Sequence, residues 1–499
     1  MMTAVLRALL LAGLFSAGAW ANVSLPALFG DHMVVQRDLP VHVWGKAEPG
    51  EAVEVAFRGQ SMATAAAEDG RWEVYLDPGS AGGPFGLVVE GNNRIEVADV
   101  HVGEVWVGSG QSNMVWPLQR SRDAEKEIAA AQFPGIRYFK VALNTSDTRL
   151  DDVEGQWQVV SPDTAGEFSG VGYFFARHLH ERLGVPMGII QSAWGGTPAE
   201  SWTSARTMAE EPALANMSAE FAAEAAADER VYAERLAAWE KRSAAAKAAG
   251  QEVPRRPPPP RALRPQNKPS ALFNAMVAPL LPYAIRGAIW YQGENNAHRG
   301  QGYLYRRLFR SMIEDWRHEW GIGAFPFLFV QLANFGRVPE ESTWPELREA
   351  QAMTLGLTNT GMAVTIDIGN PTDIHPRNKQ DVGLRLALAA RAIAYGEHDL
   401  EYSGPIFRQA TRDASGLRLW FDHAGGGLEA RGGQLEGFQV AGRDGKFVSA
   451  QASISGNTVL VSSAAVKHPV RARYAWAADA KGNLFNDAGL PASPFQTME

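Results

Sequence analysis

Short apolar runs that alternate with amphipathic stretches dominate the middle of this chain of 499 residues. The apolar runs are residues 104–107, 187–190, 288–291, 327–330 and 362–366, and the amphipathic stretches are residues 173–183, 303–320 and 382–394. The stretches repeat apolar residues at three- and four-residue spacing, as helices do. Strands that are apolar throughout and are connected by helices form parallel sheets covered on both faces. The pattern therefore predicts a three-layer α/β domain.

Both ends of the chain have a different texture, in which apolar and polar residues alternate along short runs. Such runs are residues 41–44, 52–57, 72–75, 417–421, 458–461 and 470–476, and turn signals such as Pro-Gly and Asp-Gly separate several of them. Alternation with a period of two is typical of antiparallel strands with one buried face. We expect an N-terminal β domain at 22–100, the α/β domain at 101–400 and a C-terminal β sandwich at 401–499. Whether the two β regions pack together stays open.

One segment, at about residues 204–268, interrupts the α/β domain. Residues 217–250 are rich in Ala, Glu, Arg and Lys, which favour a helix, and the proline-rich stretch 254–261 that follows favours extended polyproline conformation. The simpler interpretation is a surface excursion without chemistry. A lid over the substrate is the alternative, because long insertions in compact domains are often functional.

The first 21 residues have the pattern of a secretory signal peptide. One arginine precedes a short apolar run, and small residues then lead to an Ala-x-Ala site that ends at Ala21. The run is shorter than the roughly 20 apolar residues of a membrane-spanning helix. We therefore predict cleavage after about Ala21 and a periplasmic or secreted protein without a membrane anchor.

Charge and cysteine content narrow the partners and the chemistry. The formal net charge is -8, and such a surface repels the phosphate backbone of nucleic acids, so nucleic acid is not an expected partner. The chain has no cysteine and therefore no disulfide, thiol nucleophile or thiolate metal site. It also lacks His-Glu-x-x-His, and His375 has no second histidine at ligand spacing. The sequence predicts neither a metal nor a cofactor, and it leaves the oligomeric state open.

Polar residues gather directly after four of the predicted strands. They are Gly-Ser-Gly-Gln-Ser-Asn-Met at 108–114, Gln-Ser-Ala-Trp-Gly-Gly-Thr at 191–197, Gln-Gly-Glu-Asn-Asn at 292–296 and Asp-Ile-Gly-Asn-Pro-Thr-Asp-Ile-His at 367–375. Ligands of doubly wound sheets bind at the carboxyl ends of the strands. We expect these four loops to meet at one edge of the sheet and to form one pocket.

The serines of the first loop indicate nucleophilic catalysis. A serine is a weak nucleophile unless a base takes its proton and a third group orients that base. His375 is the best base candidate, and Asp373, two residues earlier, lies on the same side of an extended segment. Asp367 at the strand end is a rival for the orienting role. We favour Ser112 over Ser109 as the nucleophile, because Ser112 lies deeper in the loop, where a helix could begin.

Acyl transfer also needs N–H donors aimed at the oxyanion that develops in the transition state. The backbone N–H of Ser112, an N–H of Gly195 or Gly196 and an asparagine side chain of the third loop could supply three such donors. Glycine pairs are also ordinary turn makers. This pair gains its meaning only from its place at the same predicted sheet edge as Ser112 and His375.

Together these motifs resemble those of the SGNH (GDSL-like) hydrolases and, within them, of the sialate O-acetylesterase-like carbohydrate esterases. The resemblance rests on Gly-Gln-Ser-Asn-Met at 110–114, Trp-Gly-Gly-Thr-Pro at 194–198, Asn-Ala-Met-Val-Ala-Pro at 274–279, Trp-Tyr-Gln-Gly-Glu-Asn-Asn at 290–296 and Asp-Ile-His-Pro at 373–376. The motifs occur in family order. The resemblance implies a flavodoxin-like SGNH domain and a serine esterase that removes O-acetyl groups from carbohydrates.

By position in the motifs, the resemblance also implies roles for individual residues. Ser112 would be the nucleophile, His375 the base and Asp373 its partner. Gly195 or Gly196 would contribute to the oxyanion hole.

The motif at 290–296 leaves a choice between two asparagines. The Gly-x-Asn of the wider superfamily selects Asn295, whereas the Gln-Gly-Glu-x-Asn of the acetylesterase-like branch selects Asn296, which we favour. Gln111, Gln292 and Glu294 are expected to touch the substrate or to hold the loops.

The acetylated sugar is less constrained. An acidic protein disfavours a strongly anionic ligand such as sialic acid at long range, although local arginines could override this field. Arg377 is such a candidate, and capping of the following helix is an equal alternative for it. Sialic acids and hemicellulose-derived sugars therefore stand on equal terms. A non-catalytic glycan-binding protein and an SGNH esterase for a non-carbohydrate acyl ester are the competing hypotheses.

Overall fold

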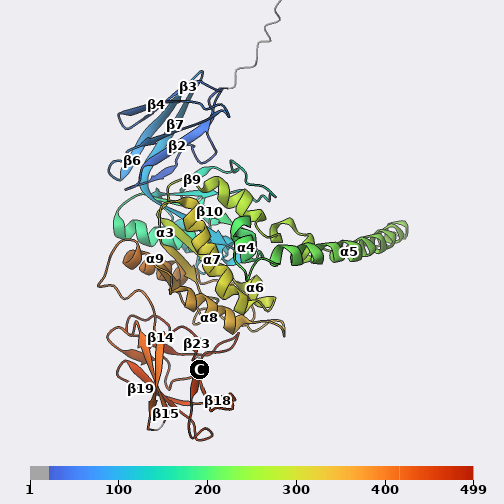
Figure 1. The fold of residues 1–499 in the computed structure, drawn as a ribbon, viewed down its shortest axis with the longest axis vertical. Helices are drawn as coiled ribbons and strands as arrows, with labels where there is room; N and C mark the ends of the chain where they lie inside the picture. Colours follow the sequence, from blue (N-terminus) through green and yellow to red (C-terminus); the bar gives the residue numbers. More distant parts are fainter. Residues whose placement is uncertain (1–21, 415, 498–499) are drawn as a thin grey trace, which may run out of the picture.

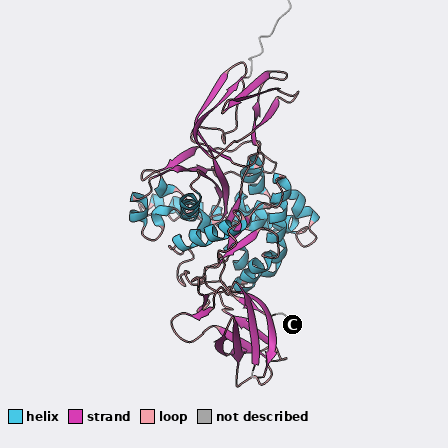
Figure 2. Ribbon diagram, turned by 90° about the vertical axis from the view of Figure 1, so that its left-hand side faces the viewer, coloured by secondary structure: helices cyan, strands magenta, loops and turns pink. Residues whose placement is uncertain are grey.

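The computed structural model describes residues 22–414 and 416–497, so the predicted signal peptide, residues 1–21, lies outside the described residues. Antiparallel β strands lie at the two ends of an elongated molecule, and a body of helices and strands lies between them (Figures 1 and 2). The two β regions are therefore at opposite ends of the molecule, which answers the question that the sequence left open. Within the described part of the chain, no helix combines the length and the apolar character needed to cross a membrane.

A sheet of eleven strands runs through the body. Its main path has the order β13-β12-β11-β7-β10-β8-β9, in which every neighbouring pair is parallel except β8 with β9. These strands are β7 (Arg94–Gly110), β8 (Phe133–Lys140), β9 (Trp157–Val160), β10 (Met187–Ala193), β11 (Gly287–Tyr291), β12 (Phe327–Val330) and β13 (Thr360–Ala363). All five predicted apolar runs contribute to it, and the prediction of an α/β fold with a large parallel sheet is confirmed.

Strand β7 connects the N-terminal β region to the central sheet. Its first half pairs antiparallel with β6 (Gly82–Glu90), and residues 104–110 pair in parallel with β10. The expected domain boundary at residue 100 thus falls inside a single strand. Because β10 lies on one side of β7 and β11 on the other, the winding of the chain reverses next to β7. Doubly wound sheets bind ligands at such a switch point.

Helices pack in pairs beside this sheet. Helix α3 (Gly170–Leu183) contacts α9 (Gln380–Ile393), and α7 (Gly302–Trp320) contacts α8 (Trp344–Thr354). The buried side chains of α7 recur every three or four residues, as its sequence pattern predicts. The shorter helices are α1 (Ser112–Val115), α2 (Ala124–Ala129), α4 (Ala205–Glu210) and α6 (Glu294–His298).

The N-terminal β region contains the ribbon β2–β5 and strands that continue the large sheet. Its strands before β6 are β1 (Val34–Gln36), β2 (Val41–Lys46), β3 (Ala52–Phe57), β4 (Gln60–Ala65) and β5 (Arg71–Leu76). Buried residues alternate with half-buried or exposed ones along β2 and β5. The region is thus one of the antiparallel β regions that the alternating runs predicted.

The C-terminal β region contains two four-stranded sheets and one strand pair, with the orders β14-β15-β20-β19, β18-β17-β21-β23 and β16-β22. Its strands are β14 (Ile406–Asp413), β15 (Gly416–Asp422), β16 (Leu428–Ala430), β17 (Phe438–Ala441), β18 (Phe447–Ser449), β19 (Gln451–Ser455), β20 (Thr458–Ser462), β21 (Arg471–Tyr474), β22 (Leu484–Asn486) and β23 (Phe495–Gln496). The buried guanidinium of Arg348 on α8 donates to the carbonyl oxygens of Ala477 and Ala478. These bonds attach the C-terminal region to the body.

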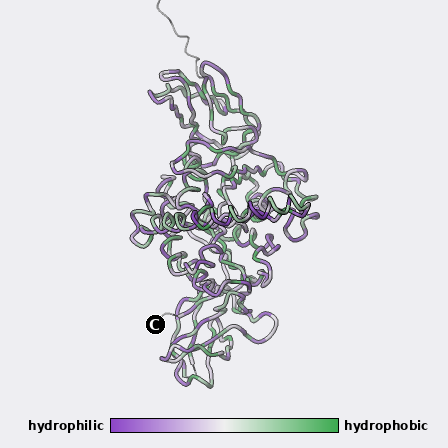
Figure 3. The backbone as a smooth tube through the Cα atoms, turned by 90° about the vertical axis from the view of Figure 1, so that its right-hand side faces the viewer, coloured by the Kyte–Doolittle hydropathy of each residue, from purple (hydrophilic) through white to green (hydrophobic). Residues whose placement is uncertain are grey.

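Helix α5 (Met217–Ala248) projects from the body (Figure 1). Hydrophilic residues recur along it (Figure 3), and only three of its 32 residues are buried. The proline-rich stretch returns along the helix: Trp239 Nε1 donates to the carbonyl oxygen of Pro254 at 2.7 Å, and the Tyr232 hydroxyl donates to that of Pro257 at 3.0 Å. The insertion is thus a helix with an extended returning segment.

Candidate active site

The loops that follow β7, β10, β11 and β13 are joined by hydrogen bonds between side chains and backbone. Asn113 Nδ2, after β7, donates to the carbonyl oxygen of Ile374 at 3.0 Å. Asn295 Nδ2, after β11, donates to the carbonyl oxygen of Gly196, after β10, at 2.7 Å. The four polar loops of the sequence therefore meet at one edge of the sheet.

Ser112 Oγ lies 2.9 Å from Nε2 of His375, although 263 residues separate them in the chain. Ser112 is the first residue of α1, whereas Ser109 lies within β7 and is fully buried. The turn between them depends on Gly110, whose φ is +131 and whose added Cβ would come within 2.2 Å of the carbonyl oxygen of Tyr291. Only glycine fits there, and the resulting turn carries Ser112 to the imidazole.

The imidazole of His375 is held by an aromatic neighbour, and its surroundings favour its neutral form. The Trp116 ring stacks on it, with ring centroids 4.8 Å apart and planes inclined by 15°. Partial burial lowers the pKa of His375, the charge of Lys379 lowers it further, and Asp373 opposes both effects. A neutral imidazole can accept the proton of a neighbouring hydroxyl.

Of the two carboxylates considered as partners of the base, Asp373 lies beside the ring. Its Oδ1 accepts the backbone N–H of His375 at 2.9 Å and lies 3.8 Å from Nδ1. Asp367 instead forms a bidentate ion pair with Arg385, with N–O distances of 2.7 and 2.6 Å. Both carboxylate oxygens of Asp367 are therefore bonded to Arg385 and not to His375.

The glycine pair borders the serine. A Cβ added to Gly195 would lie 3.4 Å from Cβ of Ser112, and both Gly195 and Gly196 are exposed. The half-buried Asn295 side chain lies on this loop through its bond to the Gly196 carbonyl. Gly195 thus borders the serine at the surface, and Asn295 is bonded to the glycine that follows it.

Asn296 has a different environment, because it is fully buried and its amide is saturated. Its Nδ2 donates to Glu200 Oε2 and to Gln301 Oε1, both at 2.9 Å. Its Oδ1 accepts from Gln292 Nε2 at 2.8 Å and from the backbone N–H of Ala199 at 3.1 Å. An amide nitrogen carries two hydrogens, so Asn296 has none left for a substrate.

A buried chain of polar side chains lies beneath the serine. Asn113 Nδ2 donates to Glu294 Oε1 at 2.6 Å, and Asn113 Oδ1 accepts from Lys379 Nζ at 2.6 Å. Burial raises the pKa of Glu294, and burial lowers the pKa of Lys379 to about 7. Asn113 follows Ser112 directly, and its other N–H bonds the residue before His375, so this chain positions both reacting groups. No sequence motif singles out Asn113 or Lys379, and their only signal in the sequence is their closeness to Ser112 and His375.

The remaining predicted substrate contacts bind protein atoms. The buried Gln111 accepts the backbone N–H of Asn295 at 3.3 Å, and the buried Gln292 donates to the carbonyl oxygen of Thr197 at 3.1 Å. Arg377 Nε donates to the carbonyl oxygen of Arg120 at 3.1 Å. All three side chains therefore hold loops together in this structure.

Comparison with known proteins places this arrangement in a family. A family model described as "Carbohydrate esterase, sialic acid-specific acetylesterase" matches residues 266–394. The sialate O-acetylesterase of Mus musculus is 32% identical to this chain, over 83% of this chain and 82% of the mouse protein. The chain belongs to the sialate O-acetylesterase family.

Two further comparisons agree with this assignment. The sialate O-acetylesterase of Homo sapiens is 32% identical, over 75% of this chain and 71% of the human protein. The crystal structure of a carbohydrate acetylesterase from Xanthomonas citri superposes with a TM-score of 0.82 at 40% identity, over 95% of this chain and 99% of that chain. This member of the sialate O-acetylesterase family is a carboxylic ester hydrolase of the carbohydrate acetylesterase type, and the resemblance inferred from the motifs is confirmed.

Proposed function

We propose that the protein is an exported serine esterase that removes O-acetyl groups from carbohydrates, with Ser112, His375 and Asp373 as its catalytic triad. The 2.9 Å contact between Ser112 Oγ and His375 Nε2 carries the proposal, since a base within hydrogen-bond reach is what activates a serine. Export rests on the sequence of residues 1–21, whose charge pattern and Ala-x-Ala site are those of a signal peptide.

The first half of the reaction forms an acetyl-enzyme. Ser112 Oγ attacks the carbonyl carbon of the acetyl ester while His375 Nε2 takes the serine proton. The tetrahedral intermediate collapses, the bond between the carbonyl carbon and the sugar oxygen breaks, and His375 gives the proton to the leaving sugar oxygen. In the second half, His375 takes a proton from water, the resulting hydroxide attacks the acetyl group, and acetate leaves as Ser112 regains its proton.

The oxyanion of each tetrahedral intermediate needs donors around the serine. We assign the backbone N–H groups of Ser112 and Gly195, with Gly196 as the alternative glycine, and the side chain of Asn295. Ser112 is the first residue of a helix, so its N–H has no partner within the helix. We assign Asn295 in preference to Asn296, because Asn295 has a second amide hydrogen free of the Gly196 bond, whereas both hydrogens of Asn296 have partners.

Asp373 is assigned as the group that orients His375. Its distance of 3.8 Å from Nδ1 is longer than a hydrogen bond, and catalytic hydrogen bonds are often long without substrate and tighten in the complex. Asp373 Oδ1 is anchored on the backbone N–H of His375 itself, so a small side-chain rotation brings the carboxylate to Nδ1.

The catalytic region is proposed to be a three-layer SGNH domain. The strand order β10-β7-β11-β12-β13 supports this, because these five strands, with β8 left out as an additional parallel strand beyond β10, take the flavodoxin-like order 2-1-3-4-5. The helix pairs α3–α9 and α7–α8 supply the two covering layers of the proposal. The β regions at 22–100 and 401–499 flank it, with the first junction inside β7.

The substrate of the proposal is an acetylated sialic acid or an acetylated hemicellulose-derived sugar. Gln111, Gln292 and Glu294 are buried and hold the loops, so we assign them to positioning and leave sugar contacts to the exposed rim. Arg377 is exposed and lies two residues after the base, and its guanidinium already donates a hydrogen bond to the Arg120 carbonyl oxygen.

The test is hydrolysis of an aryl acetate and an aryl octanoate by the purified protein and by Ser112→Ala, with Ser109→Ala as the matched control. We expect cleavage of the acetate in preference to the octanoate, loss of activity in Ser112→Ala and retained activity in Ser109→Ala. Full activity of a folded Ser112→Ala protein would refute the nucleophile. A preference for octanoate would favour a non-carbohydrate acyl ester as the substrate. Release of acetate from O-acetylated sialic acid or from acetylated xylan fragments would identify the class of sugar.

A further inference from the structure

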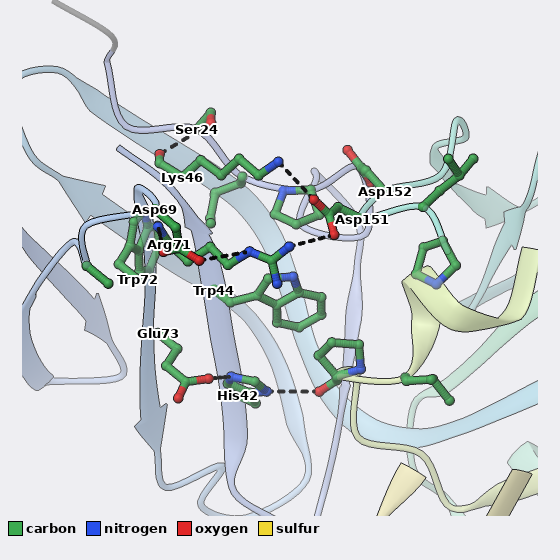
Figure 4. Close-up of a pocket in the computed structure, with 18 of the residues that line it drawn as sticks. Ser24, His42, Trp44, Lys46, Asp69, Arg71, Trp72, Glu73, Asp151 and Asp152 are labelled. Atoms are coloured by element: carbon green, nitrogen blue, oxygen red, sulfur yellow. Dashed lines mark hydrogen bonds and ion pairs between the residues drawn. The ribbon is translucent and has the colours of Figure 1, made fainter. Parts of the chain in front are cut away.

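A cavity of about 750 Å³ lies between the N-terminal β region and the body (Figure 4). One wall is the ribbon formed by β2 and β5. The other walls are the loop 149–152, which precedes β9, and the segment 278–282, which leads into β11. Cavities of about 300–1,000 Å³ at the junction of domains are common ligand sites.

The ribbon presents alternate residues of two paired strands to this cavity. On β2 these are His42, Trp44 and Lys46, and Trp44 and Lys46 pair directly across the ribbon with Glu73 and Arg71 of β5, which also line the cavity. Residues that alternate along a strand share one face of it. The wall therefore has an aromatic centre, Trp44, with polar side chains on both sides of it, as Figure 4 shows.

The indole of Trp44 is held in place by its neighbours. Phe29 meets it edge-on with ring centroids 4.7 Å apart, and Tyr283 meets it at 6.3 Å. Trp44 is half-buried, so part of its ring stays open to the cavity. The flat apolar face of an indole suits the C–H face of a sugar ring.

The charged rim of the cavity suits a neutral sugar, with its hydroxyl groups, better than it suits an anionic sugar. Asp151 accepts from Lys46 Nζ at 3.0 Å and from Arg71 Nη2 at 2.9 Å. Arg149 forms a bidentate pair with Glu319, with both distances 2.8 Å. Each of these three cations thus already has a carboxylate partner. Four carboxylates also line the cavity, Asp69, Glu73, Asp151 and Asp152, and they would repel a further negative charge.

The cavity is separate from the serine. Tyr283, adjacent to the wall residue Pro282, donates its hydroxyl to the carbonyl oxygen of Val34, which pairs with His101 on β7. About nine residues of β7 then lead from His101 to Gly110, or ~30 Å at 3.3 Å per residue. An oligosaccharide in the cavity would leave the Ser112 site free for an acetylated unit.

We propose that this cavity is a second carbohydrate site, which binds a neutral oligosaccharide through Trp44, Arg71 and Asp151. The proposal rests on the proposed carbohydrate esterase function, to which it adds a place where the glycan chain docks away from the scissile acetyl group.

Isothermal titration of the full chain with cellohexaose and with xylohexaose tests the proposal, since neither probe carries an acetyl group for Ser112 to remove. We expect measurable binding of at least one of them and a loss of about tenfold or more in affinity for Trp44→Ala. Sialyllactose, an anionic probe, is expected to bind more weakly than the neutral hexaoses.

Two further variants make the result decisive. Arg71→Met changes an exposed ion pair that contributes little to folding, so it probes the cavity even if Trp44→Ala fails to fold. Tyr303→Ala removes a more exposed aromatic ring on α7, outside the cavity, and is the control for loss of a surface ring. Weaker binding in Arg71→Met and unchanged binding in Tyr303→Ala support the site.

Equal hexaose binding in all variants, no binding of either hexaose, or preferred binding of sialyllactose would overturn the proposal. Hydrolysis of an aryl acetate by Trp44→Ala and Arg71→Met is measured in parallel and is expected to match the unmodified protein. An unmodified protein without esterase activity would refute the proposed function, while the titrations would still decide whether the cavity binds a glycan.

Discussion

The loops around Ser112 and the insertion helix α5 differ in the burial of their polar side chains. In the loops, Asn113, Glu294 and Asn296 are buried and bonded to residues far away in the sequence. Along α5 nearly all polar side chains are exposed. A buried polar group left without its partner costs about 1–3 kcal/mol, whereas most surface substitutions change stability by less than about 0.5 kcal/mol. Substitutions should therefore cost more stability in the loops around Ser112 than along α5.

The largest effect is expected at the base. His375→Gln removes the proton acceptor of Ser112 and should lower kcat/KM for an aryl acetate by about 10³-fold or more. Because the serine and the histidine act as one unit, the double variant Ser112→Ala/His375→Gln should be no slower than the worse single variant. Losses that multiply in the double variant would contradict a shared step, and Tm measured alongside would show whether the loops stay folded.

The two neighbouring asparagines should separate catalysis from stability. Asn295→Ala should lower kcat by about 100-fold, the usual loss for one oxyanion donor, with little change in Tm. Asn296→Ala should instead lower the free energy of unfolding by about 1–3 kcal/mol, because Glu200, Gln301 and Gln292 each lose one hydrogen-bond partner in a buried site. Denaturant unfolding and steady-state kinetics of both variants check this, and the reverse pattern would restore Asn296 as the donor.

The buried lysine should shift the acid limit of activity, in addition to the larger effect of burial on the pKa of His375. Ester hydrolysis needs neutral His375, so kcat/KM should rise with pH through a pKa below the ordinary histidine value of about 6.5. Lys379→Met removes a positive charge that lowers this pKa, and the acid limb should therefore move to higher pH. Arg377→Met, an exposed neighbour on the same loop, is the control. An unmoved acid limb in Lys379→Met would mean that burial alone sets the pKa of His375.

The smallest effect is expected from shortening the insertion. Replacing residues 235–253 by a short Gly-Ser linker keeps the Tyr232–Pro257 contact and removes the outer part of α5. Activity on an aryl acetate should stay within about twofold and Tm should change little, because few side chains there are buried. A tenfold loss of activity would instead support the lid interpretation and would bring α5 into the active site.

Much of the site could be predicted from local pattern. The strand ends were visible as the ends of apolar runs, and a parallel sheet brings the carboxyl ends of its strands to one edge. The convergence of the four loops could therefore be predicted from the sequence. Ser112 could be chosen over Ser109 because it lies deeper in the loop, and the structure places Ser109 within the strand β7. The two asparagines could not be separated in this way. Both lie in the short helix α6, where successive side chains point about 100° apart. Which of the two is buried therefore depends on which face of α6 packs against the rest of the protein.

The sequence by itself determined the strand and helix order, the edge at which the polar loops gather and the residue types that an acyl transfer needs, because these follow from local periodicity and motif order. The tertiary structure alone decided which carboxylate lies beside His375, which asparagine is saturated and that Lys379 reaches Asn113 across 266 residues. The physical reason is that a side chain's partners depend on the packing of segments far apart in the chain. No local pattern records that packing.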